Sequence, residues 1–376
     1  MNIGGIYLHI PYCRQACHYC NFHFSTSLQN RTEMIQAMLK EIELRKDFFT
    51  PSTEIQTIYF GGGTPSILQA KELTLLFDKI RSTFQISDQA EITIEINPED
   101  ITKDSLQHWK SLGVNRFSIG VQTFDDALLT YLNRCHDKQT TIQSLQLLSQ
   151  FGFDNYSIDL IYGIPNQTAD ILQRDLEYII QLQAPHVSAY ALTIEEKTYF
   201  GHLHQKNRLT IVPEEIVAEH FETISTTLSQ NGYEQYEISN YAKKGKRSRH
   251  NSSYWRDIPY LGIGPGAHSY NGLDRLYNIE NNPVYIRSLN SHQLPLTIEP
   301  YNSIDRYNER LLTSIRTIEG VDSNFLFSMP RKDMDKFKQT IEDFVHNDWL
   351  IQKNDSYILS SKGKLLADEI TLKLIL

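Results

Sequence analysis

The chain has 376 residues, carries a formal net charge of −9 at pH 7 and contains four cysteines. A single hydrophobic core stops growing at about 250–300 residues, so this length predicts one large core and an appended domain. Acidic residues outnumber basic ones, so the chain has no surplus of the basic side chains that bind phosphate backbones. This argues against nucleic acid as a partner. No apolar run approaches the roughly eighteen residues of a membrane span, so we do not expect an integral membrane protein.

The N-terminal residues show no targeting pattern. They have neither a basic stretch followed by an apolar core nor an Arg- and Ser-rich amphipathic leader. A low number of cysteines also suits a reducing compartment, where thiols stay free. We therefore predict a cytoplasmic protein.

Short β-rich runs alternate with helical patterns from residue 3 to about residue 195, which predicts an α/β fold with a parallel sheet and right-handed crossovers. We interpret it as a partial (β/α)6, TIM-like barrel. The predicted strands are Ile3–Ile10, Ile55–Phe60, Glu91–Ile96, Asn115–Val121, Tyr156–Tyr162 and His186–Leu192. The predicted helices are Thr32–Phe48, Ala70–Thr83, Lys103–Leu112, Thr140–Phe151 and Ala169–Gln183.

Unusual polar and glycine-rich features end or follow the predicted strands. Functional residues of such barrels lie at the C-terminal ends of the strands, so we expect these features to share one rim. Taken singly, each has a structural explanation, such as a tight turn for the glycines or a hydrogen-bond network for the polar side chains. The features are a cysteine loop, Gly61–Pro65, Glu95, Asn97, Gln122, Asp159, Tyr190 and Thr193.

Three of the four cysteines lie directly after the first predicted strand, as Cys13, Cys17 and Cys20. A disulfide would leave one of them unpaired, and a closed zinc site lacks an obvious fourth ligand elsewhere in the chain. An iron–sulfur cube held by three thiolates would keep one iron open. A zinc site or an incidental thiol cluster stays as the alternative.

This C-x3-C-x2-C loop, with Tyr19 before its last cysteine, resembles the cluster loop of radical S-adenosylmethionine (SAM) enzymes. In that family a [4Fe-4S] cluster binds SAM through its open iron, and an electron from the cluster cleaves SAM to a 5′-deoxyadenosyl radical. Further segments resemble the oxygen-independent coproporphyrinogen III oxidase branch. They are Tyr7–Cys13, Gly61–Ser66, Ile94–Pro98, Ser118–Phe124, Asn133 with Arg134, and Asp159–Pro165.

The resemblance implies roles for individual residues. Cys13, Cys17 and Cys20 would hold the [4Fe-4S] cluster, Tyr7 and Glu95 would contact the SAM bound to it, and Gly62 would lie beside the methionine end of SAM. We also expect the glycine-rich backbone to donate its amides to that end. The rest of the adenosyl pocket, where the oxidase holds a second SAM, would be lined by Tyr19, Gly63, Thr64, Gln122, Arg134 and Asp159.

Two departures separate the chain from the oxidase. The oxidase loop has a further cysteine two residues after the third, where this chain has Phe22, and the oxidase carries a long N-terminal extension, where this chain has twelve residues before the loop. The stretch from His250 to Trp255 instead resembles the H-N-x-x-Y-W signature of the haem chaperone group, the HemW-type proteins. By that resemblance His250 is a candidate haem ligand, although it could equally cap a loop beside a core tryptophan.

The pattern changes after residue 283. Ile304–Arg316 and Lys332–Asn347 are predicted helices, a hairpin is expected around residues 353–355, and Ser361–Leu374 is a predicted last helix. This order suggests a small winged-helix-like module. We predict three parts: residues 1–235 as the radical SAM barrel, 236–300 as an α+β extension with the His250 signature, and 301–376 as the C-terminal domain.

The function implied by the resemblance is a haem chaperone that binds a [4Fe-4S] cluster and SAM and passes haem to haem-requiring proteins. We expect it to cleave SAM, with electrons from a low-potential flavodoxin or ferredoxin, and not to act as an oxidase. An oxygen-independent coproporphyrinogen III oxidase and a zinc-stapled binding scaffold are the alternatives. The number of SAM molecules, the haem stoichiometry, the acceptor and the oligomeric state stay open.

Overall fold

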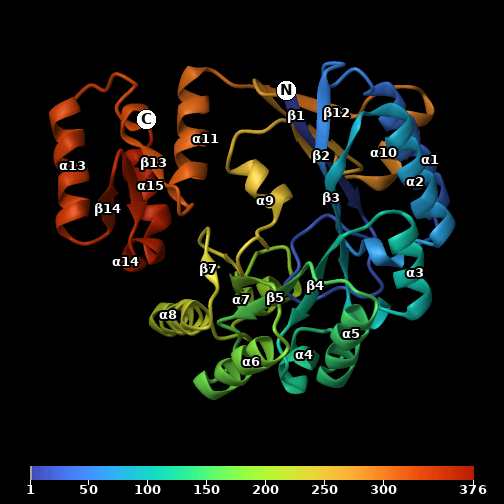
Figure 1. Cartoon of the computed structure of the whole chain (residues 1–376), viewed down its shortest axis with the longest axis horizontal. Helices are drawn as coiled ribbons and strands as arrows, with labels where there is room; N and C mark the ends of the chain where they lie inside the picture. Colours follow the sequence, from blue (N-terminus) through green and yellow to red (C-terminus); the bar gives the residue numbers. More distant parts are fainter. Residues whose placement is uncertain (1) are drawn as a thin grey trace.

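The computed structural model describes residues 2–376, and a twelve-stranded sheet forms the centre of the fold (Figure 1). Six parallel strands make up its middle and lie next to one another in chain order. They confirm the predicted strands, which are rich in the β-branched and aromatic residues that suit a pleated sheet. These strands are β1 (Asn2–Ile10), β2 (Thr53–Gly62), β3 (Ile86–Ile96), β4 (Arg116–Gln122), β5 (Tyr156–Tyr162) and β6 (His186–Ala191).

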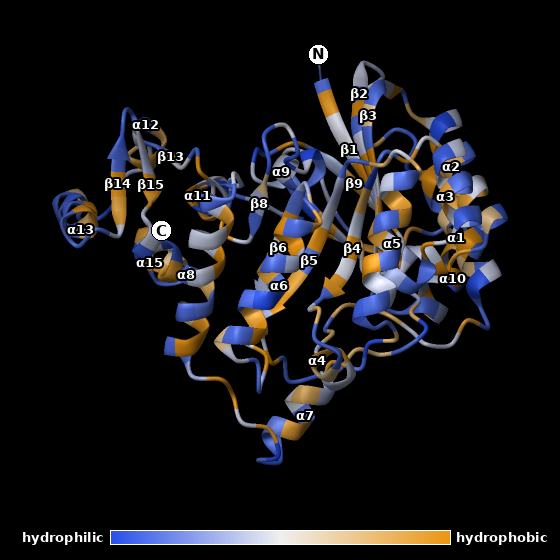
Figure 2. Ribbon diagram, turned by 60° about the horizontal axis from the view of Figure 1, so that its bottom comes forward, coloured by the Kyte–Doolittle hydropathy of each residue, from blue (hydrophilic) through white to orange (hydrophobic). Residues whose placement is uncertain are grey.

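Helices in the crossovers cover the outer face of this sheet (Figure 1). Capping side chains start several of them: Thr102, Asp137 and Thr168 each accept a hydrogen bond from a backbone N–H of the first turn. Along α5 and α6 hydrophobic and hydrophilic segments alternate, as expected for helices with one buried face (Figure 2). The helices are α1 (Arg31–Leu44), α2 (Ala70–Thr83), α3 (Lys103–Ser111), α4 (Asp126–Tyr131), α5 (Lys138–Gln150) and α6 (Ala169–Gln181), with short 3₁₀ turns η1 (Pro65–Ile67) and η2 (Pro98–Asp100).

Alternation along each strand separates the core from the interior of the barrel. Ile6, Leu8 and Ile10 of β1 are fully buried in the main hydrophobic core. The residues between them, Tyr7 and His9, point to the opposite side of the sheet because successive side chains alternate. The interior of the barrel is therefore polar.

The segment after β6 extends the same sheet on both sides. Strand β9 pairs in parallel with β1, while β8 pairs antiparallel with β6. The boundary that we predicted at residue 235 lies between β7 and β8, two paired strands, so the sheet continues across it. The elements are α7 (Tyr199–Gln205), α8 (Glu214–Gln230), β7 (Glu234–Gln235), β8 (Asn240–Ala242), α9 (Arg249–Tyr254), β9 (Tyr260–Ile263), β10 (His268–Tyr270), β11 (Asp274–Asn278), α10 (Asn282–Asn290) and β12 (Leu296–Pro300).

A buried carboxylate joins this extension to the barrel. Glu41 of α1 is fully buried and accepts hydrogen bonds from the Gly264 N–H at 2.9 Å, from Asn278 Nδ2 at 2.7 Å and from the Tyr285 hydroxyl. Its ion-pair partner is Arg45, one turn further along the helix, at 3.3 Å. The first helix therefore depends on residues more than two hundred positions away.

Residues 303–374 pack around a separate hydrophobic core beside the barrel (Figure 1). The predicted hairpin is present, but the predicted last helix is broken at Leu366, whose N–H bonds to the Gly363 carbonyl three residues back instead of four. The kinship with winged-helix modules stays a prediction. The elements are α11 (Ser303–Ile315), β13 (Val321–Asp322), α12 (Ser323–Leu326), α13 (Met334–His346), β14 (Leu350–Lys353), β15 (Ser356–Leu359), α14 (Ser361–Leu365) and α15 (Ala367–Leu374).

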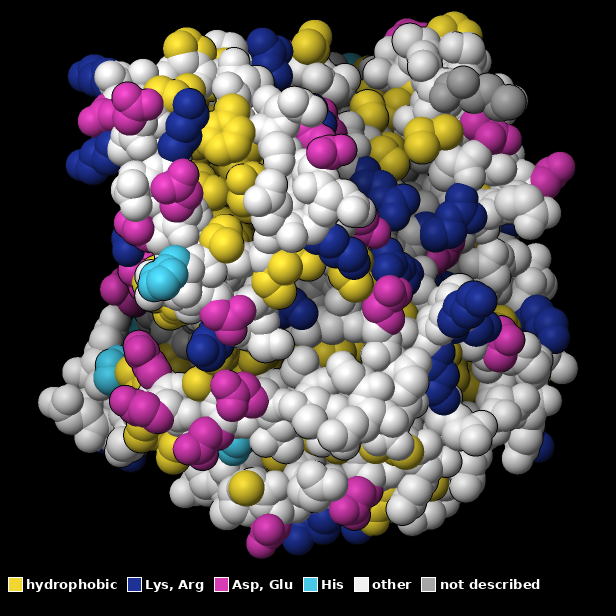
Figure 3. Space-filling view, turned by 60° about the vertical axis from the view of Figure 1, so that its left-hand side comes forward, with side chains coloured by type: hydrophobic (Ala, Val, Ile, Leu, Met, Phe, Trp, Pro, Cys, Tyr) yellow, Lys and Arg dark blue, Asp and Glu magenta, His cyan; other side chains and the backbone are white. Residues whose placement is uncertain are grey.

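None of the helices within residues 2–376 combines the length and the apolar character that a membrane span requires. Over much of the face shown in Figure 3, acidic and basic side chains lie close to one another. This pattern suits the net charge of −9 and does not form a separate basic surface on that face.

Candidate functional site

A cavity of about 530 Å³ opens at the carboxyl ends of the parallel strands. It brings together Asn97, Tyr190 and Thr193, which confirms that the polar features predicted from the sequence share one rim. Tyr7 and His250 are the predicted site residues that do not line it. The predicted residues that do are Cys13, Cys17, Tyr19, Cys20, Gly62, Gly63, Thr64, Glu95, Gln122, Arg134 and Asp159.

The cysteine loop leaves the end of β1 and folds back on itself. The Cys13 N–H donates to the Ser25 carbonyl at 3.1 Å, and the Ser25 N–H donates to the Pro11 carbonyl at 3.0 Å. All three thiols are free; Cys13 is buried, while Cys17 and Cys20 are partly accessible from the cavity. The loop thus presents its sulfurs to one space.

The chemistry of these thiols fits an iron–sulfur cluster. Burial raises the pKa of Cys13 to about 12 and that of Cys20 to about 11, so the metal-free thiols are protonated near neutral pH. Iron would supply the positive charge that buried sulfurs need to exist as thiolates. Within residues 2–376 no three or more His, Cys, Asp or Glu side chains are grouped for a single metal ion, whereas a cluster binds each thiolate to a different iron.

Arg134 ties the cysteine loop to the barrel. Its Nη1 donates to the Cys17 sulfur at 3.2 Å, and its Nη2 donates to Asn97 Oδ1 at 2.6 Å and to the Gly120 carbonyl at 2.8 Å. We predicted this residue as part of the adenosyl pocket. The structure adds a direct contact between the guanidinium and the Cys17 sulfur.

The glycine-rich stretch spans the end of β2, which includes Gly61 and Gly62, and the bend that follows it at Gly63. A Cβ atom on Gly63 would lie 2.5 Å from the Tyr12 carbonyl oxygen and 2.8 Å from that of Ile10, so only glycine lets the strand pass the cysteine loop. The Gly63 and Thr64 amides donate to these same two carbonyls, at 2.9 and 2.7 Å.

The amides of this stretch are therefore not free, and our prediction that they donate to SAM is wrong for this conformation. The Gly62 amide is also occupied, because it donates to Glu95 Oε2 at 3.1 Å. Gly62 has a φ of +104°, a conformation that glycine adopts without strain. What this stretch offers a ligand is a surface without side chains.

Two carboxyl groups face the cavity, Glu95 from β3 and Asp159 from β5, the strands on either side of β4. Glu95 accepts a hydrogen bond from the Tyr59 hydroxyl at 2.8 Å, and burial, with Asp159 nearby, raises the pKa of Glu95 to about 8. Asp159 accepts from Ser118 Oγ at 3.1 Å, and burial raises its pKa to about 6. Both groups can therefore gain or lose a proton close to neutral pH, and both can accept hydrogen bonds from ammonium or hydroxyl groups of a ligand.

Tyr7, predicted to contact SAM, lies behind the cavity wall. Its hydroxyl is 3.1 Å from His9 Nδ1, and its ring stacks on Tyr59 with centroids 6.1 Å apart. Tyr59 itself lines the cavity. In this structure Tyr7 supports the wall instead of forming it.

His250, predicted as a haem ligand, is buried in the interior with both ring nitrogens occupied. Nδ1 lies 2.8 Å from Thr57 Oγ1, and Nε2 lies 2.8 Å from the Tyr254 hydroxyl. Its side chain is 2% exposed, and burial lowers its pKa to about 3, so the imidazole is neutral. Iron ligation needs an accessible nitrogen, and the structure therefore contradicts this role for His250.

Asn251, the next residue, lines the cavity and was missed by sequence reasoning, as were Tyr59 and Ser188. Helix α9 reaches this position because the Glu91 carboxylate accepts the backbone N–H groups of Arg249 and His250, at 3.1 and 3.0 Å. The signal available in the sequence was the second letter of the H-N-x-x-Y-W stretch.

Comparison with known proteins gives a consistent relationship. Residues 7–179 match the radical SAM superfamily. The chain is 34% identical over 368 residues to the heme chaperone HemW of Bacillus subtilis, a match that covers 97% of each protein. It is 38% identical over 268 residues to heme chaperone HemW of Escherichia coli, covering 70% of this chain and 69% of that protein.

Among solved structures, the coproporphyrinogen III oxidase HemN of Escherichia coli, a radical SAM enzyme, shares the fold. The TM-score is 0.85 at 21% identity, over 100% of this chain and 90% of the oxidase. The sequence likeness to HemW proteins extends over nearly the whole chain and includes the cysteine loop and α9. The protein therefore belongs to the HemW heme chaperone family of the radical SAM superfamily.

Proposed function

We propose that this protein is a haem chaperone, which carries a [4Fe-4S] cluster on Cys13, Cys17 and Cys20, binds SAM beside it and passes haem to haem-requiring proteins. The observation that carries the proposal is a three-thiol loop that lines a cavity of about 530 Å³, in a chain that is 34% identical to a heme chaperone over 97% of its length. Family membership leaves a zinc-stapled scaffold without support.

The residues around the cavity suit this cofactor pair. When bound, the cluster and SAM together supply one-electron chemistry. The chain contributes a glycine surface at Gly62 and Gly63, a cation at Arg134 and the carboxyl groups of Glu95 and Asp159. Tyr19, Thr64 and Gln122 would line the adenosyl part, and Asn251 joins them from α9.

The partners follow from this chemistry. SAM cleavage needs a low-potential electron donor, for which a flavodoxin or a ferredoxin is the expected class, and haem transfer needs a haem-accepting protein. Four free thiols suit the reducing conditions of the cytoplasm. We propose that location, and no nucleic acid partner.

Anaerobic reconstitution with iron and sulfide tests the cluster. We expect a brown protein with about four irons per chain, and 5′-deoxyadenosine on reduction in the presence of SAM. Variants with Cys13, Cys17 or Cys20 changed to alanine should lose most of the iron. The matched control is Cys135→Ala, since Cys135 lines the same cavity but is exposed and donates to Gln15 Oε1 at 3.2 Å.

Haem titration of the purified protein tests the chaperone function. A Soret change that saturates, followed by transfer of the haem to an apo-haemoprotein, is the expected result. Protoporphyrinogen formed anaerobically from coproporphyrinogen III would instead identify the oxidase. A protein that produces no Soret change under any condition is not a haem chaperone.

A further inference from the structure

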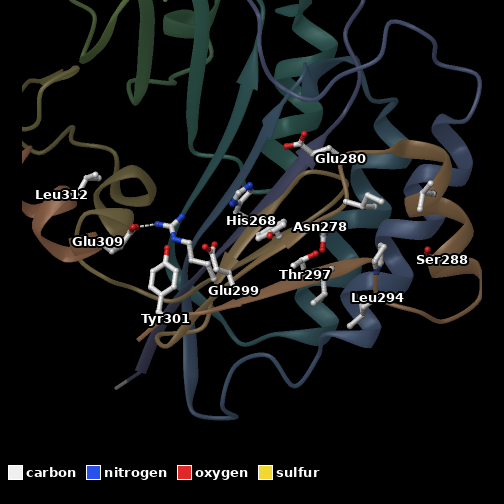
Figure 4. Close-up of a pocket in the computed structure, with 16 residues that line it drawn as sticks. His268, Asn278, Glu280, Ser288, Leu294, Thr297, Glu299, Tyr301, Glu309 and Leu312 are labelled. Carbon is white, nitrogen blue, oxygen red and sulfur yellow. Dashed lines mark hydrogen bonds and ion pairs between the residues drawn. The ribbon is translucent and has the colours of Figure 1, made fainter. Parts of the chain in front are cut away.

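A second cavity, of about 1060 Å³, lies in the extension and shares no lining residue with the SAM-side cavity. Strands β10, β11 and β12 form its floor (Figure 4). Val284 and Ser288 of α10 line one side, and Glu309 and Leu312 of α11 line the other. The volume is at the upper end of the range for small-molecule sites, roughly 300–1,000 Å³, and leaves space for a large flat ligand.

His268 lies on the floor of this cavity (Figure 4). It is directly opposite Tyr277 in the antiparallel pair, and Tyr277 is opposite Thr297 on the next strand, so the three side chains share one face of the sheet. The His268 and Tyr277 rings stack with centroids 5.7 Å apart and an interplanar angle of 30°. This row crosses the middle of the floor.

The His268 imidazole is available to a ligand, unlike that of His250. It is exposed, and within residues 2–376 neither of its ring nitrogens has a hydrogen-bond partner. Burial in the cavity, followed by the charge of Arg275, lowers its pKa below the usual value. The ring is therefore neutral near pH 7, the form in which histidine binds metals.

The surroundings of His268 combine apolar side chains with charged ones. Tyr301 adds an aromatic ring, and the aliphatic side chains include the partly exposed Leu294 and Leu312. Arg275 pairs with Glu309, and its buried Nε has no partner within residues 2–376. An aliphatic and aromatic cavity with one histidine and one arginine suits a porphyrin that carries carboxylate arms.

We propose that this cavity binds haem, with a ring nitrogen of His268 as an axial ligand of the iron. The proposal rests on the haem chaperone function proposed above and gives that function a site. Tyr277, whose ring stacks on the His268 imidazole, would hold the orientation of that ligand, and the free Nε of Arg275 would bind a propionate.

Acidic side chains would weaken the binding of a porphyrin with two propionates at this site. Glu280 and Glu299 also line the cavity and repel the propionates, so these must turn toward Arg275 or toward solvent. The cavity is open, and a carrier that hands its haem to another protein needs moderate affinity. Since the two cavities share no lining residue, haem binding here needs no cluster.

Haem titration of matched histidine variants tests the site. We expect His268→Ala to weaken haem binding at least about tenfold, which is roughly 1.4 kcal/mol, and added imidazole to restore the Soret band of the unchanged protein. His268→Cys should give a thiolate-type spectrum. His292→Ala is the control, because His292 is an exposed histidine of the same extension outside the cavity, and it should change the affinity less than twofold.

A variant with Cys13, Cys17 and Cys20 all changed to alanine separates this site from the cluster, and it should titrate with haem as the unchanged protein does. If the unchanged protein binds haem and His268→Ala binds it equally well, the site proposed here is wrong while the chaperone function stands. If the unchanged protein shows no Soret change, the chaperone function itself fails.

Discussion

The His250 imidazole stacks on the Tyr59 ring, with centroids 4.9 Å apart and planes inclined by 23°. Tyr59 in turn donates a hydrogen bond of 2.8 Å to Glu95 at the SAM-side cavity. The signature of α9 therefore supports a cavity carboxyl group from behind, and Asn251 of the same helix lines that cavity. The signature therefore lies beside the cavity lined by the three cysteines.

Replacing His250 should consequently affect SAM more than haem. His250→Ala removes the stack and leaves the Thr57 and Tyr254 hydroxyls without their partner, which should lower the free energy of unfolding by about 2–4 kcal/mol. SAM affinity should fall about tenfold, while haem affinity stays within twofold. Calorimetry with SAM and a Soret titration measure the two. His250→Phe, which keeps a stacked ring, should recover part of the SAM affinity; a haem affinity lost in both variants would contradict the assignment.

The raised pKa of Glu95 makes SAM binding depend on pH. Burial places this pKa at about 8, so the carboxyl group is mostly protonated at pH 7 in the free protein. A cationic ligand favours the carboxylate, so SAM binding should release a proton at pH 7, and affinity should rise from pH 6 to pH 8. Titration calorimetry in two buffers of different ionisation enthalpy measures how many protons are released when SAM binds. Glu95→Gln should bind SAM more weakly and without this slope, and equal heats in both buffers would rule the linkage out.

The close passage of β2 over the cysteine loop predicts a severe effect of Gly63→Ala. The added Cβ would meet two backbone carbonyls at 2.5 and 2.8 Å, which cannot move without moving the loop. After reconstitution, the iron content of this variant should be well below that of the unchanged protein. Gly152→Ala serves as control, because nothing lies within 4 Å of its Cβ and its φ of +78° alone should cost about 1 kcal/mol. Normal iron content in the Gly63 variant would contradict the contact.

The buried Glu41 should contribute far more to stability than its neighbour on α1, Glu43. Glu41→Gln leaves Arg45 as an uncompensated buried charge, and we expect a loss of about 3–5 kcal/mol in denaturant unfolding. Glu43 pairs with Lys79 at the surface, so Glu43→Gln should not measurably move the unfolding midpoint. Similar midpoints for the two variants would show that the network does not hold the extension.

The parallel strands and the rim could be predicted because their signals are local. A run such as Tyr156–Tyr162 shows its strand character within a few residues, and parallel strands bring Glu95 and Asp159 to the same edge. The spacing of the three cysteines predicted the cysteine loop in the same way, because this signal is also local. The end of β2 was predicted two residues short, because Gly61 and Gly62 have low strand propensity and only the pairing with β1 extends the strand.

The features that were missed depend on partners far away in the chain. The pairing of Gly5 with Tyr260 has no local pattern, so the continuation of the sheet into the extension stayed invisible. His250 looks like a free ligand until Thr57 from β2 is placed beside it. Tyr7 lies six residues before Cys13, but the alternation of β1 and the bond to His9 turn it behind the wall.

Because β9 pairs with β1, the segment that matches the radical SAM superfamily is shorter than the unit that we expect to fold cooperatively. The superfamily match ends at residue 179, yet β1 needs residues 260–263 at its free edge, and Glu41 needs Asn278 and Tyr285. An excised fragment that ended at residue 179 would expose two bare strand edges and a buried acid without its donors. We therefore expect a fragment limited to the superfamily match not to fold by itself.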